Sequence, residues 1–238
     1  MLEPLLIETR SRSAPAALRM LALAGMLAIG GCGSTSEILL SAQFENQAPS
    51  GILAIDHPIG QFRAGDFGTV RVVAGPAGTS GNWLQLIQAQ RLVPPAHVRG
   101  VFAAYRGDGH YLFTMRLVII TGSAASVSFQ SSNAVNPTSF VAVAFPSNGY
   151  LFSQDGGAIV GRFPHDQPFS VAVNLTIGAT SSATVTLLGM AHGSAAYTVE
   201  PRLNPDARNF LAIELDTDAG TAASTFFVND ISMIYNAP

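Results

Sequence analysis

Short apolar segments that alternate with period two dominate the chain after about residue 38. In 169–177 every odd position is apolar, and in 209–217 Leu211, Ile213 and Leu215 alternate with small or acidic residues. Successive side chains of a strand point to opposite faces, so this alternation indicates strands with one buried and one polar face. No segment after residue 38 has a convincing helical period. The chain is therefore predicted to be all-β.

Gly, Pro, Asn and Ser residues separate the apolar segments at intervals of about 8–12 residues. The predicted strands are 38–44, 67–74, 83–90, 98–105, 111–120, 125–130, 139–145, 149–153, 157–163, 168–177, 182–188, 195–200, 208–217 and 225–235. Many short alternating strands with regular turn signals are typical of an antiparallel sandwich or barrel. We expect one such domain over 38–238.

The N-terminal region has the features of a secretory signal. Residues 20–29 form an uncharged apolar run, and Arg10, Arg12 and Arg19 precede it. A membrane-spanning helix needs roughly 20 apolar residues, whereas a run of about ten with a basic flank is typical of a signal peptide. Two glycines and Cys32, the sole cysteine, follow this run.

The segment 29–32, Ile-Gly-Gly-Cys, resembles the bacterial lipobox. This resemblance implies that 1–31 is cleaved, that Cys32 carries lipid, and that 32–37 forms a tether. Gly33 stands where an Asp would retain such a protein at the inner membrane, so the resemblance implies the outer membrane of a bacterial cell envelope. The acidic residues Glu3 and Glu8 depart from the pattern and suggest a translation start downstream of Met1. The alternatives are a buried cysteine after an ordinary signal peptide, or a short apolar helix of the fold.

The charge balance argues against a nucleic-acid partner. Three of the 12 basic residues and two of the 15 acidic residues precede Cys32, which leaves nine Arg and 13 acids, a formal charge of −4. Binding to phosphates or to an anionic membrane surface depends on clusters of basic residues, and none remains. We expect membrane contact through the lipid alone.

Five segments together resemble concanavalin A-like and carbohydrate-binding-module jelly rolls. They are Ala42–Asn46, Gly68–Val73, Gly81–Leu86, Gly161–Gly189 and Phe226–Met233. The first is similar to the "Phe-Glu" opening strand of those modules, and the last to their closing "Val-Asp-Asp-Ile" strand. The resemblance implies an antiparallel β-sandwich of jelly-roll type, with a carbohydrate as the expected ligand.

Three acids recur at alternate positions of one predicted strand: Glu214, Asp216 and Asp218. They would share one face at steps of about 7 Å. The pattern is similar to the catalytic strand of laminarinase-like jelly-roll hydrolases, but it ends in Asp and lies near the C-terminus. The face is interpreted as a solvated surface, a ligand or cation site, or a catalytic pair, in that order.

The jelly-roll resemblance also implies a structural calcium site. In those modules acids of the first and last strands help to hold the ion, and Glu45 and Asp230 occupy these positions. Calcium takes six to eight oxygen ligands, some of them backbone carbonyls. The alternative is that Glu45 is a rim residue and Asp230 a turn residue. No other cofactor is expected.

Aromatic and histidine residues give weaker indications. Trp83 is interpreted as a core residue, and Tyr105, Tyr111 and Tyr150 flank turns where they could stack on sugars. The five histidines, His57, His97, His110, His165 and His192, lack metal-ligand spacing and are interpreted as loop residues. Neither a Gly-x-Ser-x-Gly motif nor a phosphate-binding loop occurs.

The sequence therefore favours a lipid-anchored envelope protein with a non-catalytic β-sandwich that binds a ligand, most plausibly a carbohydrate. Two alternatives stay open. One is a structural or assembly factor that binds another envelope protein, and the other is a divergent jelly-roll glycosidase.

Overall fold

The computed structural model describes residues 36–44, 54–56, 61–64, 69–89, 96–101, 106–131, 139–153, 159–179, 181–190, 193–199, 210–217 and 223–238. The regular structure in these ranges consists of β-strands. Among these residues, no helix is long and apolar enough to cross a membrane. Cys32 and the predicted signal peptide lie outside the described residues.

The strands of the described part are β1 (Ser36–Ala42), β2 (Ala54–Asp56), β3 (Gln61–Ala64), β4 (Thr69–Ala74), β5 (Asn82–Gln88), β6 (His97–Val101), β7 (Gly109–Ile119), β8 (Ala125–Ser131), β9 (Ser139–Phe145), β10 (Tyr150–Ser153), β11 (Ile159–Arg162), β12 (Phe169–Ile177), β13 (Ser182–Met190), β14 (Gly193–Val199), β15 (Phe210–Asp216) and β16 (Ser224–Asn236). Fourteen of them coincide with predicted strands. The other two, β2 and β3, have three and four residues, which is too short to establish an alternation.

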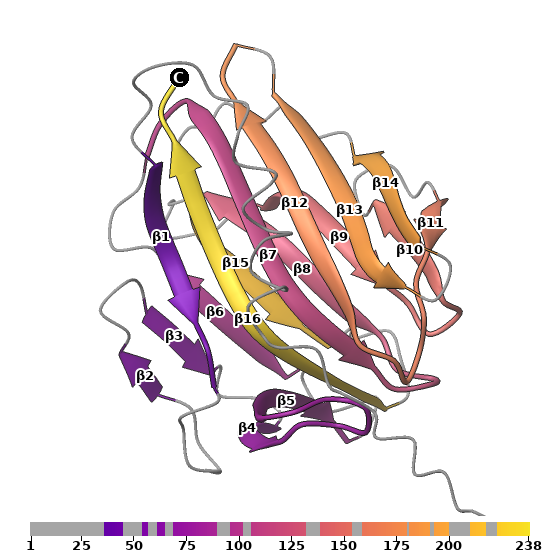
Figure 1. The fold of residues 1–238 in the computed structure, drawn as a ribbon. Helices are drawn as coiled ribbons and strands as arrows, with labels where there is room; N and C mark the ends of the chain where they lie inside the picture. The colour runs from indigo at the N-terminus through magenta and orange to yellow at the C-terminus, as the bar shows by residue number, and fades with distance from the viewer. Residues whose placement is uncertain are drawn as a thin grey trace, which may run out of the picture. The chain divides into compact units, whose positions relative to one another are not determined.

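Two antiparallel sheets form the sandwich (Figure 1). Sheet A has the strand order β14-β13-β12-β7-β16-β5-β4, and β1 also pairs with β16. Sheet B has the order β11-β10-β9-β8-β15-β6-β3-β2. The predicted fold class, an antiparallel jelly-roll sandwich, is confirmed.

Apolar side chains of both sheets fill the space between them. On β12 the odd positions of 169–177 are buried and the even positions are not, as the alternation predicts. The rings of Phe113 on β7 and Phe129 on β8 meet edge to face with centroids 5.4 Å apart, and both side chains are fully buried. Because β7 belongs to sheet A and β8 to sheet B, this pair joins the two layers of the core.

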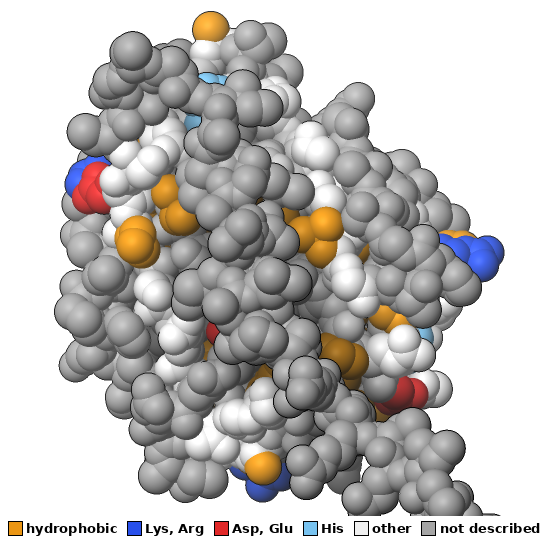
Figure 2. Space-filling model, in the orientation of Figure 1, with side chains coloured by type: hydrophobic (Ala, Val, Ile, Leu, Met, Phe, Trp, Pro, Cys, Tyr) orange, Lys and Arg blue, Asp and Glu red, His pale blue; other side chains and the backbone are white. Residues whose placement is uncertain are grey.

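The outward side chains of β12, in the middle of sheet A, are uncharged and mostly polar. Ser170, Ala172, Asn174 and Thr176 of β12 point away from the core. Figure 2 shows this side of the molecule, where charged side chains of the described residues form a few separate spots. Hydroxyl and amide groups therefore supply the polar surface of β12, as expected for a chain with only 11% charged residues.

A carboxylate ties the β11–β12 connection to the turn after β7. Asp166 accepts hydrogen bonds from the backbone N–H of Thr121, at 3.0 Å, and from the Thr121 hydroxyl. These two bonds, the hydroxyl bond first, lower the pKa of Asp166 below its ordinary value of 3.8, and the nearby His165 acts in the same direction. Hydrogen bonds that favour the charged form have this effect on any carboxyl group.

This shift predicts a pH dependence of stability. A carboxyl whose pKa is lowered by folding contributes stability that is present above its unfolded pKa and is lost as the pH falls through its folded pKa. We expect the native protein to lose stability below about pH 4, and Asp166→Asn to reduce that loss. Asn keeps the carbonyl acceptor and tolerates the φ of 56° at this position. Denaturant unfolding at about pH 6 and about pH 3 measures the loss of stability in each protein. Equal losses in the native protein and in Asp166→Asn would contradict this prediction.

A polar row on the outer face of sheet B

The central strands of sheet B carry polar side chains on the face turned away from the core. Glu214 of β15 lies directly opposite Ser128 of β8 on one side and Arg99 of β6 on the other. Arg99 in turn lies opposite Arg63 of β3. The intervening Val98, Ile213 and Leu215 are buried in the core. We call Ser128, Glu214, Arg99 and the position of Arg63 the polar row.

A second line of polar residues runs beside the polar row. Asp216, two residues after Glu214, lies opposite Ser126 of β8 and His97 of β6. The structure therefore brings two of the three predicted acids, Glu214 and Asp216, to one face of β15. Asp218 lies outside the described residues.

This face is shielded from water, although it points away from the core. Ser126, Ser128 and Gln130 retain only 5%, 9% and 6% of their exposure, and Glu214 and Asp216 are half-buried. The interpretations of the acidic face of β15 as a solvated surface, a ligand or cation site, or a catalytic pair stay predictions. Buried polar groups are expensive unless they are paired, so a shielded polar surface needs a specific explanation.

Hydrogen bonds hold Glu214 in place but leave two neighbouring atoms unsatisfied. The Gln130 amide nitrogen donates to the Glu214 carboxylate and, at 3.4 Å, to the Ser128 hydroxyl. Within the described structure, the buried Oε1 of Gln130 and Nε of Arg99 have no hydrogen-bond partner. One atom is an acceptor and the other a donor. A ligand with hydroxyl groups could satisfy both, since a hydroxyl both donates and accepts.

On the β9–β10 side of the polar row, the outward side chains are small or aromatic. Ala142 and Ala144 of β9 lie opposite Ser128 and Ser126. Phe152 of β10 lies opposite Ala144. Small side chains therefore lie beside the charged centre, and the half-buried Phe152 ring lies at their border.

Of the tyrosines predicted to stack on sugars, Tyr150 is the one that fits. It is half-buried on β10, where the Arg162 guanidinium lies 4.7 Å from the ring centroid and donates to its hydroxyl at 2.9 Å. Tyr111 is buried at 1% exposure, and its hydroxyl donates to the backbone carbonyls of Arg106 and Gly107. Burial raises the pKa of Tyr111, which fits a structural residue. Tyr105 lies outside the described residues.

The prediction for Trp83 agrees with the structure, whereas the prediction for two of the histidines does not. Trp83 is fully buried, as predicted, but in a small second cluster with Val118 and Phe227. His97 and His110 lie on β6 and β7, so their interpretation as loop residues is wrong. His57 and His192 lie outside the described residues.

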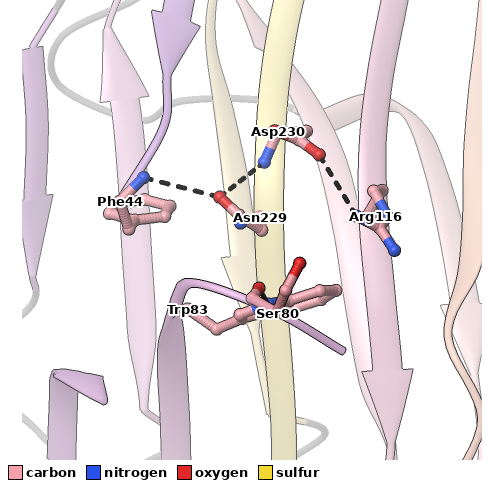
Figure 3. A network of polar contacts seen from close by, with 6 residues as sticks. All are labelled: Phe44, Ser80, Trp83, Arg116, Asn229 and Asp230. Carbon is pink, nitrogen blue, oxygen red and sulfur yellow. Dashed lines mark hydrogen bonds and ion pairs between the residues drawn. The ribbon is translucent and has the colours of Figure 1, made fainter. Parts of the chain in front are cut away.

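The predicted calcium ligand Asp230 lies at a bulge of β16 in sheet A (Figure 3). Its carboxylate forms an ion pair with Arg116 at 3.6 Å, and its φ of 52° is left-handed. The fully buried Asn229 beside it accepts hydrogen bonds from the backbone N–H groups of Phe44, at 3.4 Å, and Asp230, at 2.9 Å. These contacts join the bulge of β16 to the end of β1.

Calcium at this position stays a prediction. Glu45, the other predicted ligand, lies outside the described residues. The part of the chain that the structure describes contains no group of three or more His, Cys, Asp or Glu residues that could hold a metal ion.

No protein-family model and no curated protein matches the sequence. Solved structures match it in three dimensions. A sialidase aligns with a TM-score of 0.58 at 11% identity over 82% of this chain, which spans only 18% of the sialidase chain. An endo-β-1,4-glucuronan lyase from Trichoderma reesei aligns with a TM-score of 0.54 at 10% identity, covering 79% of this chain and 94% of the lyase.

The catalytic domain of a glycoside hydrolase family 131 protein from Coprinopsis cinerea aligns with a TM-score of 0.54 at 14% identity. The alignment covers 83% of this chain and 94% of that domain. At such low identities these likenesses show the fold alone, the jelly-roll sandwich of concanavalin A-like type.

The comparison corrects one expectation. The sequence favoured a domain that is not an enzyme, and the comparison contradicts this expectation, because two proteins that share the fold over nearly their whole aligned chains are enzymes, a lyase and a glycoside hydrolase.

Proposed function

We propose that this protein is a carbohydrate-active enzyme that binds a glycan across the outer face of sheet B and cleaves a glycosidic bond there. The observation that carries the proposal is the shielded polar row, in which a hydrogen-bonded Glu214 lies between the unsatisfied atoms of Gln130 and Arg99. The enzymes of carbohydrate chemistry that share the fold support it.

The dimensions of the face suit an extended chain of sugars. Neighbouring strands lie about 4.8 Å apart, so the five strands from β9 to β3 span about 19 Å. Ala142, Ser128, Glu214, Arg99 and the position of Arg63 follow one another along this line. Sugar hydroxyls would supply the donor that Gln130 lacks and an acceptor for Arg99.

Glu214 and Asp216 supply the two carboxyl groups that glycoside hydrolysis uses. One carboxyl group protonates the leaving oxygen, and the other attacks the sugar or activates water. The two residues are two positions apart on one face of β15, so their Cα atoms lie about 7 Å apart. Inverting enzymes hold their carboxyl groups about 6.5–9.5 Å apart and retaining enzymes about 5–5.5 Å. The separation of the carboxyl groups themselves, and not that of the Cα atoms, decides between the two reactions.

Glu214 is the better base of the two. The Gln130 amide donates to its carboxylate and so fixes its orientation. A general base must be held within reach of the water that it activates, and this contact holds the carboxyl group of Glu214 in one orientation. Asp216 would then protonate the leaving oxygen.

The experiment incubates the full-length chain, in detergent, with a panel of neutral and acidic polysaccharides. New reducing ends, with nuclear magnetic resonance to identify the anomer formed first, would support hydrolysis and fix its stereochemistry. Unsaturated products would show that the protein cleaves the glycosidic bond by elimination and not by hydrolysis. A chain that neither binds nor cleaves any glycan would overturn the proposal.

We further propose that Cys32 anchors this enzyme to the bacterial outer membrane through lipid. The support is the sequence pattern of residues 20–32. One acyl chain binds a membrane only marginally, whereas the several chains of a lipoprotein hold it stably.

The anchor predicts a mass difference. We expect the protein from bacterial membranes to begin at Cys32 and to carry acyl chains, and Cys32→Ala to lack the added mass and to leave the membrane fraction. Intact-mass spectrometry of both proteins measures this. An unlipidated native protein that retains residues 20–29 would contradict the anchor.

A further inference from the structure

The Arg99 guanidinium lacks an anionic partner in the described structure. Glu214 lies directly opposite Arg99 on the neighbouring strand, yet no ion pair joins them, and Glu214 instead accepts a hydrogen bond from Gln130. The Nε atom of Arg99 is buried without a hydrogen-bond partner. Arg99 as a whole is half-buried, but its Nε donor is buried, and a buried donor is costly unless an acceptor satisfies it.

The register places a second arginine on the other side of Arg99. Arg63 of β3 occupies the position directly opposite Arg99. Like charges in directly opposed positions of neighbouring strands are destabilising. The register thus puts two arginine positions in succession beside a single carboxylate at the β6–β3 end of the polar row.

We infer that the glycan carries a uronate carboxylate, which Arg99 receives at the β6–β3 end of the polar row. This inference rests on the proposed function, because it names the substrate class of the same site. A guanidinium presents its N–H donors in a planar fork that matches a carboxylate. The ligand would satisfy the buried Nε atom and offset the charge of Arg99, while its hydroxyls reach Gln130. Neutral glycans offer only the hydroxyls.

The test uses matched pairs of glycans and the full-length chain in detergent. Each pair has the same linkage and ring and differs at C6: glucan and glucuronan, mannan and mannuronan, galactan and galacturonan. A glucan sulfated at C6 separates a carboxylate from any other anion. We expect calorimetric binding to at least one uronate member, at least tenfold tighter than binding to its neutral and sulfated counterparts.

Variants of Arg99 test whether this residue binds the uronate carboxylate. Because a charge-assisted hydrogen bond would be lost, we expect Arg99→Gln to weaken uronate binding about 10- to 100-fold. Arg99→Lys keeps the charge but loses the planar fork of donors, and we expect it to weaken binding by a smaller factor. The matched control is Arg71→Gln on β4 of sheet A, where Arg71 donates to Gln85 at the surface. It should leave binding unchanged. Because an unsatisfied buried donor is costly, Arg99→Gln should leave the thermal midpoint at or above its native value.

Failure of this inference is distinguishable from failure of the proposed function. Equal binding of neutral and uronate members, tighter binding of the sulfated glucan, or unchanged binding by Arg99→Gln would overturn the uronate assignment while glycan binding stands. If no member of any pair is bound or cleaved, both proposals fail.

Discussion

Replacing Glu214 by Gln should reduce the rate of glycan cleavage by about 10²–10⁴-fold, the contribution typical of one positioned acid–base group. Gln has nearly the same shape as Glu but cannot take up a proton from water. Glycan binding should change much less than the turnover number, because the hydroxyl contacts of the polar row remain. Initial rates at saturating glycan, with calorimetric binding of the same glycan, separate the two effects.

A matched control makes this result specific. Glu37→Gln introduces the same change on β1 of sheet A, where Glu37 forms an exposed ion pair with Arg106. This variant should keep the native rate. If Glu214→Gln also keeps it, the cleavage chemistry does not use Glu214, and the assignment of base and acid on β15 is wrong.

The strands could be predicted because their signal is local. On β12 and β15 apolar and polar residues alternate over seven to nine positions, and the buried positions are the predicted ones. Such a pattern needs no knowledge of neighbouring strands, because each strand buries one face in either sheet. β2 and β3 were missed because their signals are only three and four residues long.

The site could be predicted only along a single strand. The spacing of Glu214 and Asp216 put both on one face, and the structure places them so. Their partners Arg99 and Ser128 come from strands more than 80 residues earlier, and only the register brings them opposite Glu214. No pattern in a single sequence states which strands are neighbours in a jelly roll.

One signal for the site was nevertheless in the sequence. In β8 the polar residues Ser126, Ser128 and Gln130 alternate with apolar ones, and such alternation was interpreted simply as one buried and one wet face. The strand is central, with β15 and β9 on its two sides. A polar face on a central strand that is itself shielded from water is the unusual feature, and only the structure shows the shielding.

Replacing Phe129 by Ala should lower the free energy of unfolding by about 3–5 kcal/mol, the usual cost of emptying a buried phenylalanine site. Phe129 is fully buried, and its ring packs edge to face on Phe113 of the opposite sheet. Its neighbours Ser128 and Gln130 point to the other face, so the core contact of Phe129 also fixes the strand that carries them. Denaturant unfolding measures the loss. Phe152→Ala, the same change on the outer face of β10, should cost far less; equal losses would show that Phe129 does not hold the two sheets together.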